Sequence, residues 1–285
     1  MRIIRSIRRL QTWRRQQDSH REKIGFVPTM GALHAGHLSL IHRARKHCDR
    51  VVVSIFVNPL QFGPREDLGR YPRSFHADQQ LCQDAGVDLL FVPSRQDMYP
   101  QDFQTRVIVS RLTQRWEGQA RPTHFEGVTT VVTKLLYVVG PHLAYFGQKD
   151  YQQLLVVKQL VQDLHMKVKI VRCPTVRESD GLALSSRNQY LQGTQRTQAR
   201  LLVAALRHGR DAINGGQRNG RILQATMNKI FAKQPEVILE YLAVCDPCTL
   251  EPLTRVQGTV ILLGAIRLGQ IRLIDNLLVV SPKGA

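Results

Sequence analysis

Apolar residues along the chain follow two alternating spacings. Short runs rich in Val, Ile, Leu and Phe, typical of buried strands, occupy residues 24–27, 51–57, 88–92, 143–146 and 168–171. Between these runs, apolar residues recur at helical spacing over residues 37–47, 74–85, 128–139 and 151–164. Strands that alternate with helices in this way pair in parallel through right-handed crossovers. The pattern therefore predicts an α/β fold with a doubly wound, Rossmann-like parallel sheet and helices on both faces.

The alternation of strand and helix patterns stops between residues 173 and 193, where Pro174, Gly181 and Gly193 accompany a polar stretch. Helical patterns follow at residues 195–213 and 222–233, and strand patterns at 237–244, 260–266 and 271–274. We therefore predict two domains: a Rossmann-like domain of residues 1–175 and a smaller C-terminal α+β domain of residues 176–285.

The first 21 residues allow two interpretations. Ile3, Ile4, Ile7 and Leu10 have the spacing of an ordinary surface helix, whereas the arginines among them would also suit an amphipathic transit peptide. We favour the surface helix. Since no apolar run approaches the 18 residues of a membrane span, no membrane association is predicted.

Charge is the most unusual feature of the composition. The chain has 285 residues, with 40 Lys and Arg against 22 Asp and Glu, a formal net charge of +18. Residues 1–178 carry 27 basic and 15 acidic side chains, and residues 179–285 carry 13 and 7, so the excess is spread over both predicted domains. Aromatic residues make up only 6%, and no basic block is interleaved with them. A specific nucleic-acid partner is therefore not expected, although weak nonspecific binding is compatible with the charge.

Cysteine usage indicates a reducing compartment, and hence a cytoplasmic protein. The five cysteines are an odd and mostly scattered set. Cys245 and Cys248 have the spacing of a redox or metal motif, but no second pair completes a site, so we interpret their spacing as incidental.

The clearest chemical motif follows the first predicted strand of the sheet. His34, Ala35, Gly36 and His37 form an HxGH sequence at the start of the next helix. A helix that begins there offers backbone N–H groups and a positive dipole end to a phosphate, and Gly36 allows close approach. In isolation the two histidines could be ordinary turn and cap residues, but their position in an α/β sheet favours phosphate binding. The motif is neither a dinucleotide fingerprint nor a P-loop.

Further segments extend this motif into a family resemblance. They are PTMG at 28–31, FVNPLQF at 56–62, YPR at 71–73, RPTHF at 121–125, FGQKDYQQ at 146–153 and RESDGLALSSRN at 177–188. In this order they resemble the pantothenate synthetase family of the HxGH nucleotidyltransferase superfamily. The resemblance covers most of residues 20–195 and is weaker beyond.

The resemblance implies a two-step reaction with ATP as a substrate. The carboxylate of pantoate attacks the α-phosphorus to give pantoyl adenylate and pyrophosphate, and β-alanine then displaces AMP to give pantothenate. It also implies Mg²⁺ with the nucleotide, a homodimer, a first domain that binds nucleotide and pantoate, and a C-terminal domain that acts as a lid. No covalent enzyme intermediate is required.

The family's functional residues carry over position by position. Four positions would be catalytic: His34, His37, Lys149 and Arg187. The ATP-binding positions would be Pro28, Thr29, Met30, Gly31, His34, Gly36, His37, Gly147, Gln148, Lys149, Asp150, Val176, Leu184, Ser185, Ser186 and Arg187. Pantoate would contact Met30, Asn58, Gln61, Arg121 and Gln153. Asp78 matches a carboxylate near the magnesium, although taken alone it would be expected on the surface of a helix.

Two positions depart from the family pattern. Leu184 replaces a methionine, an exchange that conserves volume, and Ala35 stands where an acidic residue is frequent. The main competing function keeps the nucleotidyltransferase fold but uses a phosphorylated acceptor. The segments at 58–63 and 121–127 argue against it, because they supply amides and one arginine where a second phosphate would need several cations.

Overall fold

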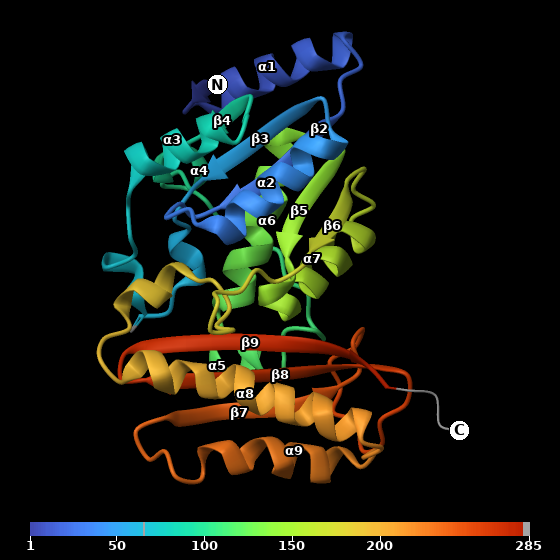
Figure 1. Ribbon diagram of the computed structural model, residues 1–285. Coiled ribbons are helices and arrows are strands. Elements are labelled where there is room, and N and C mark those ends of the chain that lie inside the picture. The colour runs from blue at the N-terminus through green and yellow to red at the C-terminus, as the bar shows by residue number, and fades with distance from the viewer. Residues whose placement is uncertain (65, 282–285) are drawn as a thin grey trace. The chain divides into compact units, whose positions relative to one another are not determined.

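The structure, a computed structural model, describes residues 1–64 and 66–281 (Figure 1). The chain divides into two compact units. The first comprises Met1–Gln148 and Gln152–Val176, and the second comprises Lys149–Tyr151 and the residues from Arg177 onward. The three residues at 149–151 therefore group with the second unit, although the chain on either side of them belongs to the first.

A six-stranded parallel sheet forms the centre of the first unit, which confirms the predicted doubly wound fold. Its spatial order is β1-β4-β3-β2-β5-β6. The strands are β1 (Arg2–Ile4), β2 (Ile24–Thr29), β3 (Arg50–Ile55), β4 (Leu89–Phe91), β5 (Leu143–Gly147) and β6 (Lys169–Cys173).

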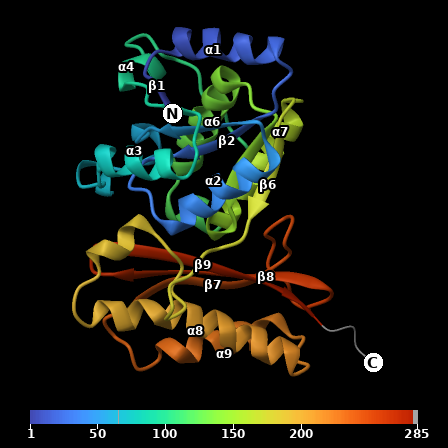
Figure 2. The same cartoon turned by 45° about the horizontal axis from the view of Figure 1, so that its top comes forward.

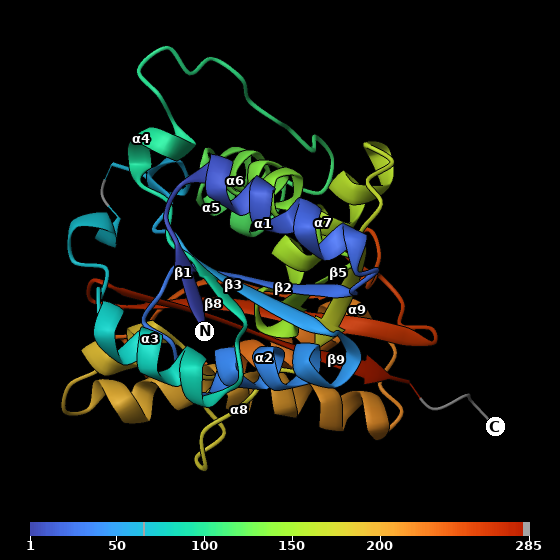
Figure 3. The same ribbon diagram turned by 90° about the horizontal axis from the view of Figure 1, so that it is seen from above.

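Helices cover both faces of this sheet. They are α1 (Ile7–Ser19), α2 (Ala35–His47), α3 (Phe75–Asp84), α4 (Arg95–Met98), α5 (Glu117–Ala120), α6 (His124–Val139) and α7 (Tyr151–Asp163). Phe26 and Val52 pack into the core with α1, α6 and α7, whereas Val27 and Val53 pack with α2 and α3 on the opposite face (Figure 3). No helix in the described ranges has the length and apolar character that a membrane span would need.

The N-terminus differs from the prediction of a single surface helix. Ile3 and Ile4 lie in β1, which pairs with β4 at the edge of the sheet, and the helix begins only at Ile7. A strand of three residues is too short to show a two-residue period, and its isoleucines also fit helical spacing. Pairing with β4, a strand far away in the sequence, decides the conformation.

The order of the strands places a switch point beside β2. From β2 the chain adds β3 and then β4 on one side, and later adds β5 and β6 on the other. In such sheets, ligands bind at the carboxyl ends of the strands where the order reverses. The HxGH motif follows β2, the 3₁₀ turn η1 (Pro59–Gln61) follows β3, and Gln148 follows β5, so all three lie at this edge.

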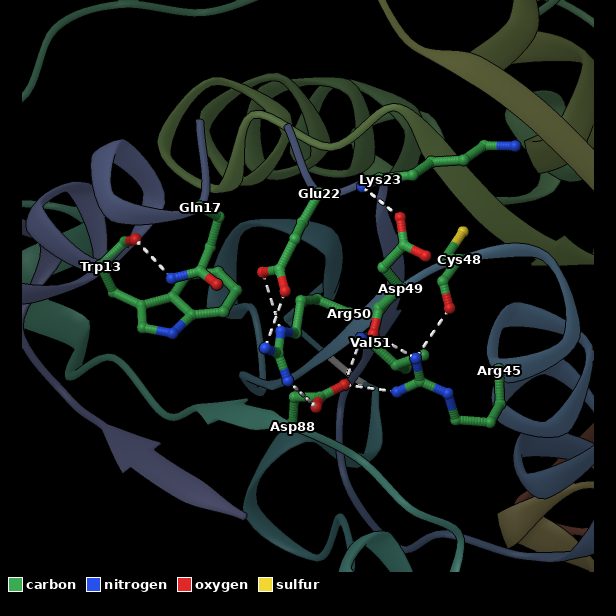
Figure 4. A network of polar contacts seen from close by, with 10 residues as sticks. All are labelled: Trp13, Gln17, Glu22, Lys23, Arg45, Cys48, Asp49, Arg50, Val51 and Asp88. Carbon is green, nitrogen blue, oxygen red and sulfur yellow. Dashed lines mark hydrogen bonds and ion pairs between the residues drawn. The ribbon is translucent and has the colours of Figure 1, made fainter. Parts of the chain in front are cut away.

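At the opposite edge, an ion-pair network joins the starts of β3 and β4 (Figure 4). Arg50 donates to Glu22 at 2.8 Å and to Asp88 at 3.2 Å, and Asp88 also accepts from the backbone N–H of Val51 at 2.7 Å and pairs with Arg45. These side chains are partly exposed, so each pair contributes modestly to stability. Arg45 and Arg50 therefore help to hold the starts of these strands together.

Gly127 lets η1 lie directly on α6. A Cβ atom at this glycine would be 2.3 Å from the carbonyl oxygen of Leu60 and 2.5 Å from the nitrogen of Gln61. The side chain of Asn58 also donates to the carbonyl of Gly127 at 3.0 Å. Only a residue without a side chain allows this contact, which sets the position of Gln61.

The second unit is the predicted smaller α+β structure. Its antiparallel sheet has the order β7 (Ile238–Cys245), β8 (Thr259–Leu268) and β9 (Ile271–Val280), and α8 (Gln195–Asn214) and α9 (Gly220–Asn228) pack along one face (Figure 2). The last strand is longer than the predicted 271–274. It continues through Asp275 and Asn276, which are polar but nearly buried.

Candidate active site

The turn that leaves β2 is built by Thr29 and Gly31. The hydroxyl of Thr29 donates to the carbonyl of Ser54 at 2.7 Å and accepts from the backbone N–H of Gly31 at 3.2 Å. Gly31 has a φ of +84°, which strains any residue with a Cβ, and an added Cβ would be 3.0 Å from the carboxylate of Asp78. Both residues thus shape the turn that precedes the HxGH motif.

Asp78 is the anchor of this turn. It is 2% exposed, so the expectation of a surface position was wrong. Its carboxylate accepts from the backbone N–H groups of Ala32 at 2.9 Å and Leu33 at 2.8 Å, and from the hydroxyl of Ser74 at 3.3 Å. Ala32 has a φ of +50°, an unfavourable conformation that these bonds stabilise. These contacts do not test the expectation that the Asp78 carboxylate lies near the magnesium.

His34 and His37 cap α2 reciprocally. Nδ1 of His34 accepts from the N–H of Gly36 at 3.1 Å, and Nδ1 of His37 accepts from the N–H of His34 at 3.3 Å. The centroids of the two rings are 4.2 Å apart. A ring nitrogen that accepts a hydrogen bond carries no proton, so in both residues the proton is on Nε2.

This arrangement unites the two interpretations of the motif. The histidines are cap residues, and the cap itself fixes the tautomer in which each ring has an N–H donor on its other nitrogen. Two such donors lie at the amino end of α2, whose first turn contains no acidic residue. The positive end of the helix dipole adds to their effect. The site is suited to the oxygens of a phosphate group.

Three of the expected pantoate residues meet at the ends of β2 and β3. The amide of Asn58 donates to Oε1 of Gln61 at 3.1 Å, and Nε2 of Gln61 donates to the sulfur of Met30 at 3.0 Å. Tyr99, which the sequence did not single out, donates its hydroxyl to Asn58 at 2.8 Å. The chain of bonds fixes the orientation of the Gln61 amide, with its NH₂ group toward Met30.

Arg121 lies beside Gln61, and its guanidinium is paired with Glu66. Its guanidinium donates to Glu66 at 2.7 Å and to the carbonyl of Gln61 at 3.2 Å, and contacts Nε2 of His124 at 3.2 Å. Nδ1 of His124 is 2.9 Å from the same Gln61 carbonyl. Neither Glu66 nor His124 was predicted. The only sequence signal was the position of His124 within the RPTHF segment.

Burial and Arg121 set the charge states in this cluster. Burial lowers the pKa of His124 to about 4, and the positive charge of Arg121 acts in the same direction, so the ring is neutral at pH 7. Its Nδ1–H therefore donates to the Gln61 carbonyl, and Nε2 accepts from Arg121. Burial alone would raise the pKa of Glu66, but the hydrogen bonds and charge of Arg121 outweigh it and hold that pKa below its ordinary value.

The remaining expected residues follow β5 and β6. Gly147 ends β5, Gln153 is half-buried on α7, and Val176 ends the first unit. Lys149 and Asp150 belong to the second unit, with the ammonium of Lys149 3.3 Å from the carboxylate of Asp150.

Leu184, Ser185, Ser186 and Arg187 also belong to the second unit. Ser185 caps a 3₁₀ turn, η4 (Ser186–Tyr190), by accepting from the N–H of Arg187 at 3.3 Å. That these residues act with His34 and His37 on one ligand stays a prediction. Within the described part of the chain, no three His, Cys, Asp or Glu side chains form a cluster that could hold a metal ion.

Replacement of His124 by Asn should remove part of the acid sensitivity of the fold. An Asn amide can still donate to the Gln61 carbonyl but does not titrate. The pKa of His124 is about 4 in the folded state and about 6.5 when unfolded, so the unfolded state gains a proton first as pH falls. The wild type should therefore lose about 2 kcal/mol more than His124→Asn between about pH 7.5 and pH 5. Urea unfolding of both proteins at the two pH values measures this, and equal losses would refute the assignment.

Known proteins share this arrangement of sequence and fold. Residues 2–278 match the family model described as pantoate-beta-alanine ligase. The chain is 48% identical over 279 residues to a pantothenate synthetase of Heliobacterium modesticaldum, covering 98% of this chain and 99% of the relative. It is 51% identical over 253 residues to that of Moorella thermoacetica, covering 89% of each.

Solved structures agree with the fold. The crystal structure of pantothenate synthetase from Thermus thermophilus superposes with a TM-score of 0.92 at 48% identity, covering 97% of this chain and 99% of the other. Pantoate-beta-alanine ligase from Francisella tularensis, described as complexed with beta-gamma ATP and beta-alanine, superposes with a TM-score of 0.80 at 37% identity, covering 100% and 99%. The chain belongs to the pantoate–β-alanine ligase family.

Proposed function

We propose that this chain condenses pantoate with β-alanine in an ATP-dependent reaction that forms pantothenate, AMP and pyrophosphate. The observation that carries the proposal is the pair of Nε2–H donors of His34 and His37 at the amino end of α2, beside the switch point of the sheet. Family membership over residues 2–278 supports it. The Francisella relative's complex with a nucleotide and β-alanine supports the choice of substrates.

In the first step, a carboxylate oxygen of pantoate bonds to the α-phosphorus of ATP while the bond from that phosphorus to the bridging oxygen breaks. Pyrophosphate leaves with the electron pair. Both reactants are anions, so donors and cations are needed where charge gathers on the phosphoryl oxygens. His34 and His37 supply N–H donors, Lys149 and Arg187 supply positive charge, and the hydroxyls of Ser185 and Ser186 supply short contacts.

Magnesium enters with ATP as part of the substrate. Mg²⁺ keeps several waters and takes phosphate oxygens as ligands, so it needs few protein ligands and no preformed cluster of acids. The described residues fit this requirement, because Asp78 is the only acid that we place near the HxGH turn and its oxygens already accept backbone N–H groups. Asp78 then serves the nucleotide by holding the turn in place.

Pantoate presents a carboxylate and two hydroxyls, which amides can bind as donor and acceptor. The NH₂ group of Gln61 faces the sulfur of Met30, a weak acceptor that a pantoate oxygen can replace. Gln153 supplies a second amide, and Met30 an apolar contact for the methyl groups. Arg121 shares its charge with Glu66, so it acts on pantoate mainly through the position of Gln61.

In the second step, the amine of β-alanine attacks the carbonyl carbon of the adenylate, AMP leaves with its oxygen, and the nitrogen loses a proton. No side chain bonds covalently to the substrate, so positioning supplies much of the rate. The other expected ATP contacts, including the backbone from Pro28 to Gly36 and the residues around Gly147 and Val176, belong to the same proposal. So does the role of the C-terminal unit as a lid.

The purified chain should form AMP only when pantoate and β-alanine are both present, with one pantothenate for each AMP. Replacement of His34 or Lys149 by Ala should lower kcat by about 10²-fold or more, since each removes a donor aimed at developing charge. Lys158→Ala, a change at an exposed lysine on α7, is the matched control and should retain activity. Pyrophosphate release without an amide product would indicate a different acceptor, and full activity in His34→Ala would refute the site.

The substitution Asp78→Asn tests whether Asp78 holds the turn before the HxGH motif or binds the magnesium ion. Asn lacks one acceptor for the N–H groups of Ala32 and Leu33, so the turn should loosen and kcat should fall by about tenfold. The Mg²⁺ concentration that gives half-maximal rate should not change, because the phosphates of ATP hold the ion. Activity measured against Mg²⁺ at fixed ATP tests this. A large increase in the required Mg²⁺ would instead identify Asp78 as a ligand.

We also propose that the chain acts in the cytoplasm as a homodimer, as its resemblance to a biosynthetic enzyme family implies. Light scattering coupled to size exclusion should then give twice the mass of one chain. The mass of a single chain, at concentrations where the enzyme is active, would contradict the dimer.

A further inference from the structure

We propose that Asp275 and Asn276 on β9 are positioning residues for the adenylation step, which tie Lys149 and the 177–188 loop to one strand. The 177–188 loop is the segment RESDGLALSSRN, which includes Ser185, Ser186 and Arg187. This inference rests on the proposed function.

Asp275 holds the start of the loop through Arg177. The guanidinium donates to both carboxylate oxygens, at 2.6 and 2.9 Å, and Asp275 is 5% exposed. The same guanidinium donates to the carbonyls of Gly181 at 3.1 Å and Asn276 at 3.2 Å. A bidentate pair of this kind defines direction as well as distance. Arg177 is thereby fixed to β9 and to the turn of its own loop.

Asn276 holds Lys149. It is 2% exposed, and its Nδ2 donates to the backbone carbonyl of Lys149 at 2.8 Å. The backbone N–H of Asn276 donates to the carboxylate of Asp275 at 2.7 Å, so the Asp275 side chain is also bonded to the main chain of Asn276. Because the carbonyl carbon is bonded to Cα, this contact restricts the point from which the lysine side chain extends.

The loop itself is internally braced. Nδ2 of Asn188 donates to Glu178 at 2.8 Å and to the carbonyl of Ala183 at 3.1 Å. Arg196 of α8 donates to Glu178 at 2.5 Å and to Asp180 at 3.0 Å. The segment 184–187 therefore lies between two points, Ala183 and Asn188, that are bonded to each other. Arg177 pairs with Ala183 across the base of the loop, so a shift at Arg177 would be transmitted to Ala183.

Stability alone does not account for this arrangement. A buried ion pair contributes little net stability, because the loss of hydration offsets the attraction between the charges. The two side chains are in the interior of a strand, yet their bonds run to the loop and to Lys149, the segments that carry two of the proposed cations. We infer that Asp275 and Asn276 fix the positions of Lys149 and the 177–188 loop. Position matters for the rate, because a displacement of about 1 Å at a reacting centre can lower it about 10²-fold.

The two half-reactions allow a direct test. Pantoate-dependent exchange of labelled pyrophosphate into ATP reports adenylation alone, and supplied pantoyl adenylate reports the attack by β-alanine alone. We expect Asn276→Ala and Asp275→Asn to lower exchange by about 10- to 100-fold while the second step changes by less than about threefold. Arg177→Lys keeps the charge but loses the bidentate contact, so it should reproduce the defect if Asp275→Asn does not fold.

Arg272→Gln is the matched control. Arg272 is also on β9, where it donates to Glu240 at 2.7 Å, so the change removes a different ion pair from the same strand. Its exchange rate should stay within about twofold of the wild type, as expected for a partly exposed ion pair. Exchange in Asn276→Ala no slower than in Arg272→Gln, or equal loss in both half-reactions, would overturn the positioning role. Absence of exchange in the wild type would instead refute the proposed function.

Discussion

The site depends on how the chain is held where it leaves the carboxyl ends of parallel strands. Strand residues are fixed by ladder hydrogen bonds, but the residues just beyond them lose that support and must find other partners. After β2 the partner is the buried carboxylate of Asp78, which holds Ala32 in a conformation that it would otherwise avoid. The His34 and His37 rings then cap α2 and, in doing so, acquire their Nε2–H donors. The chemistry of the motif is thus a consequence of backbone geometry.

Buried polar side chains also bond to the main chain after β3 and in the second unit. After β3, Asn58 and Gly127 hold the turn that carries Gln61, and the neutral ring of His124 binds the Gln61 carbonyl. In the second unit, Asn276 binds the carbonyl of Lys149. Each time a buried polar side chain satisfies a main-chain group next to a proposed functional residue. Several arginines, such as Arg50 and Arg177, likewise hold the fold through ion pairs with acids.

The architecture could be predicted from the sequence because it rests on local periodicity. The strands that begin near residues 24, 51 and 143 and the helices between them were correctly placed to within a few residues. The strand β1 was missed because it depends on a distant partner, β4. The strand β9 was cut short because Asp275 and Asn276 are polar, and Asp275 is paired with the distant Arg177. Local pattern does not show that a polar residue will be buried and paired.

The candidate site was likewise only partly predictable from the sequence. Residue types and motif order identified His34, Gln61 and Lys149 as candidates, but not the contacts that hold them. The partnership of Arg121 with Glu66 spans 55 residues, and the burial of Asp78 depends on a turn 45 residues earlier in the chain. A single sequence gives no spacing signal for such pairs, so the structure was needed to show which side chains hold each candidate residue in place.

A crystal structure with ATP, Mg²⁺ and pantoate would test the central claim most directly, that the cap of α2 creates the phosphate-binding donors. We predict phosphate oxygens within hydrogen-bonding distance of Nε2 of both His34 and His37, while each Nδ1 keeps its bond to the main chain. A nucleotide that binds away from the amino end of α2, or rings that turn so that Nδ1 leaves the backbone to meet the phosphates, would contradict it.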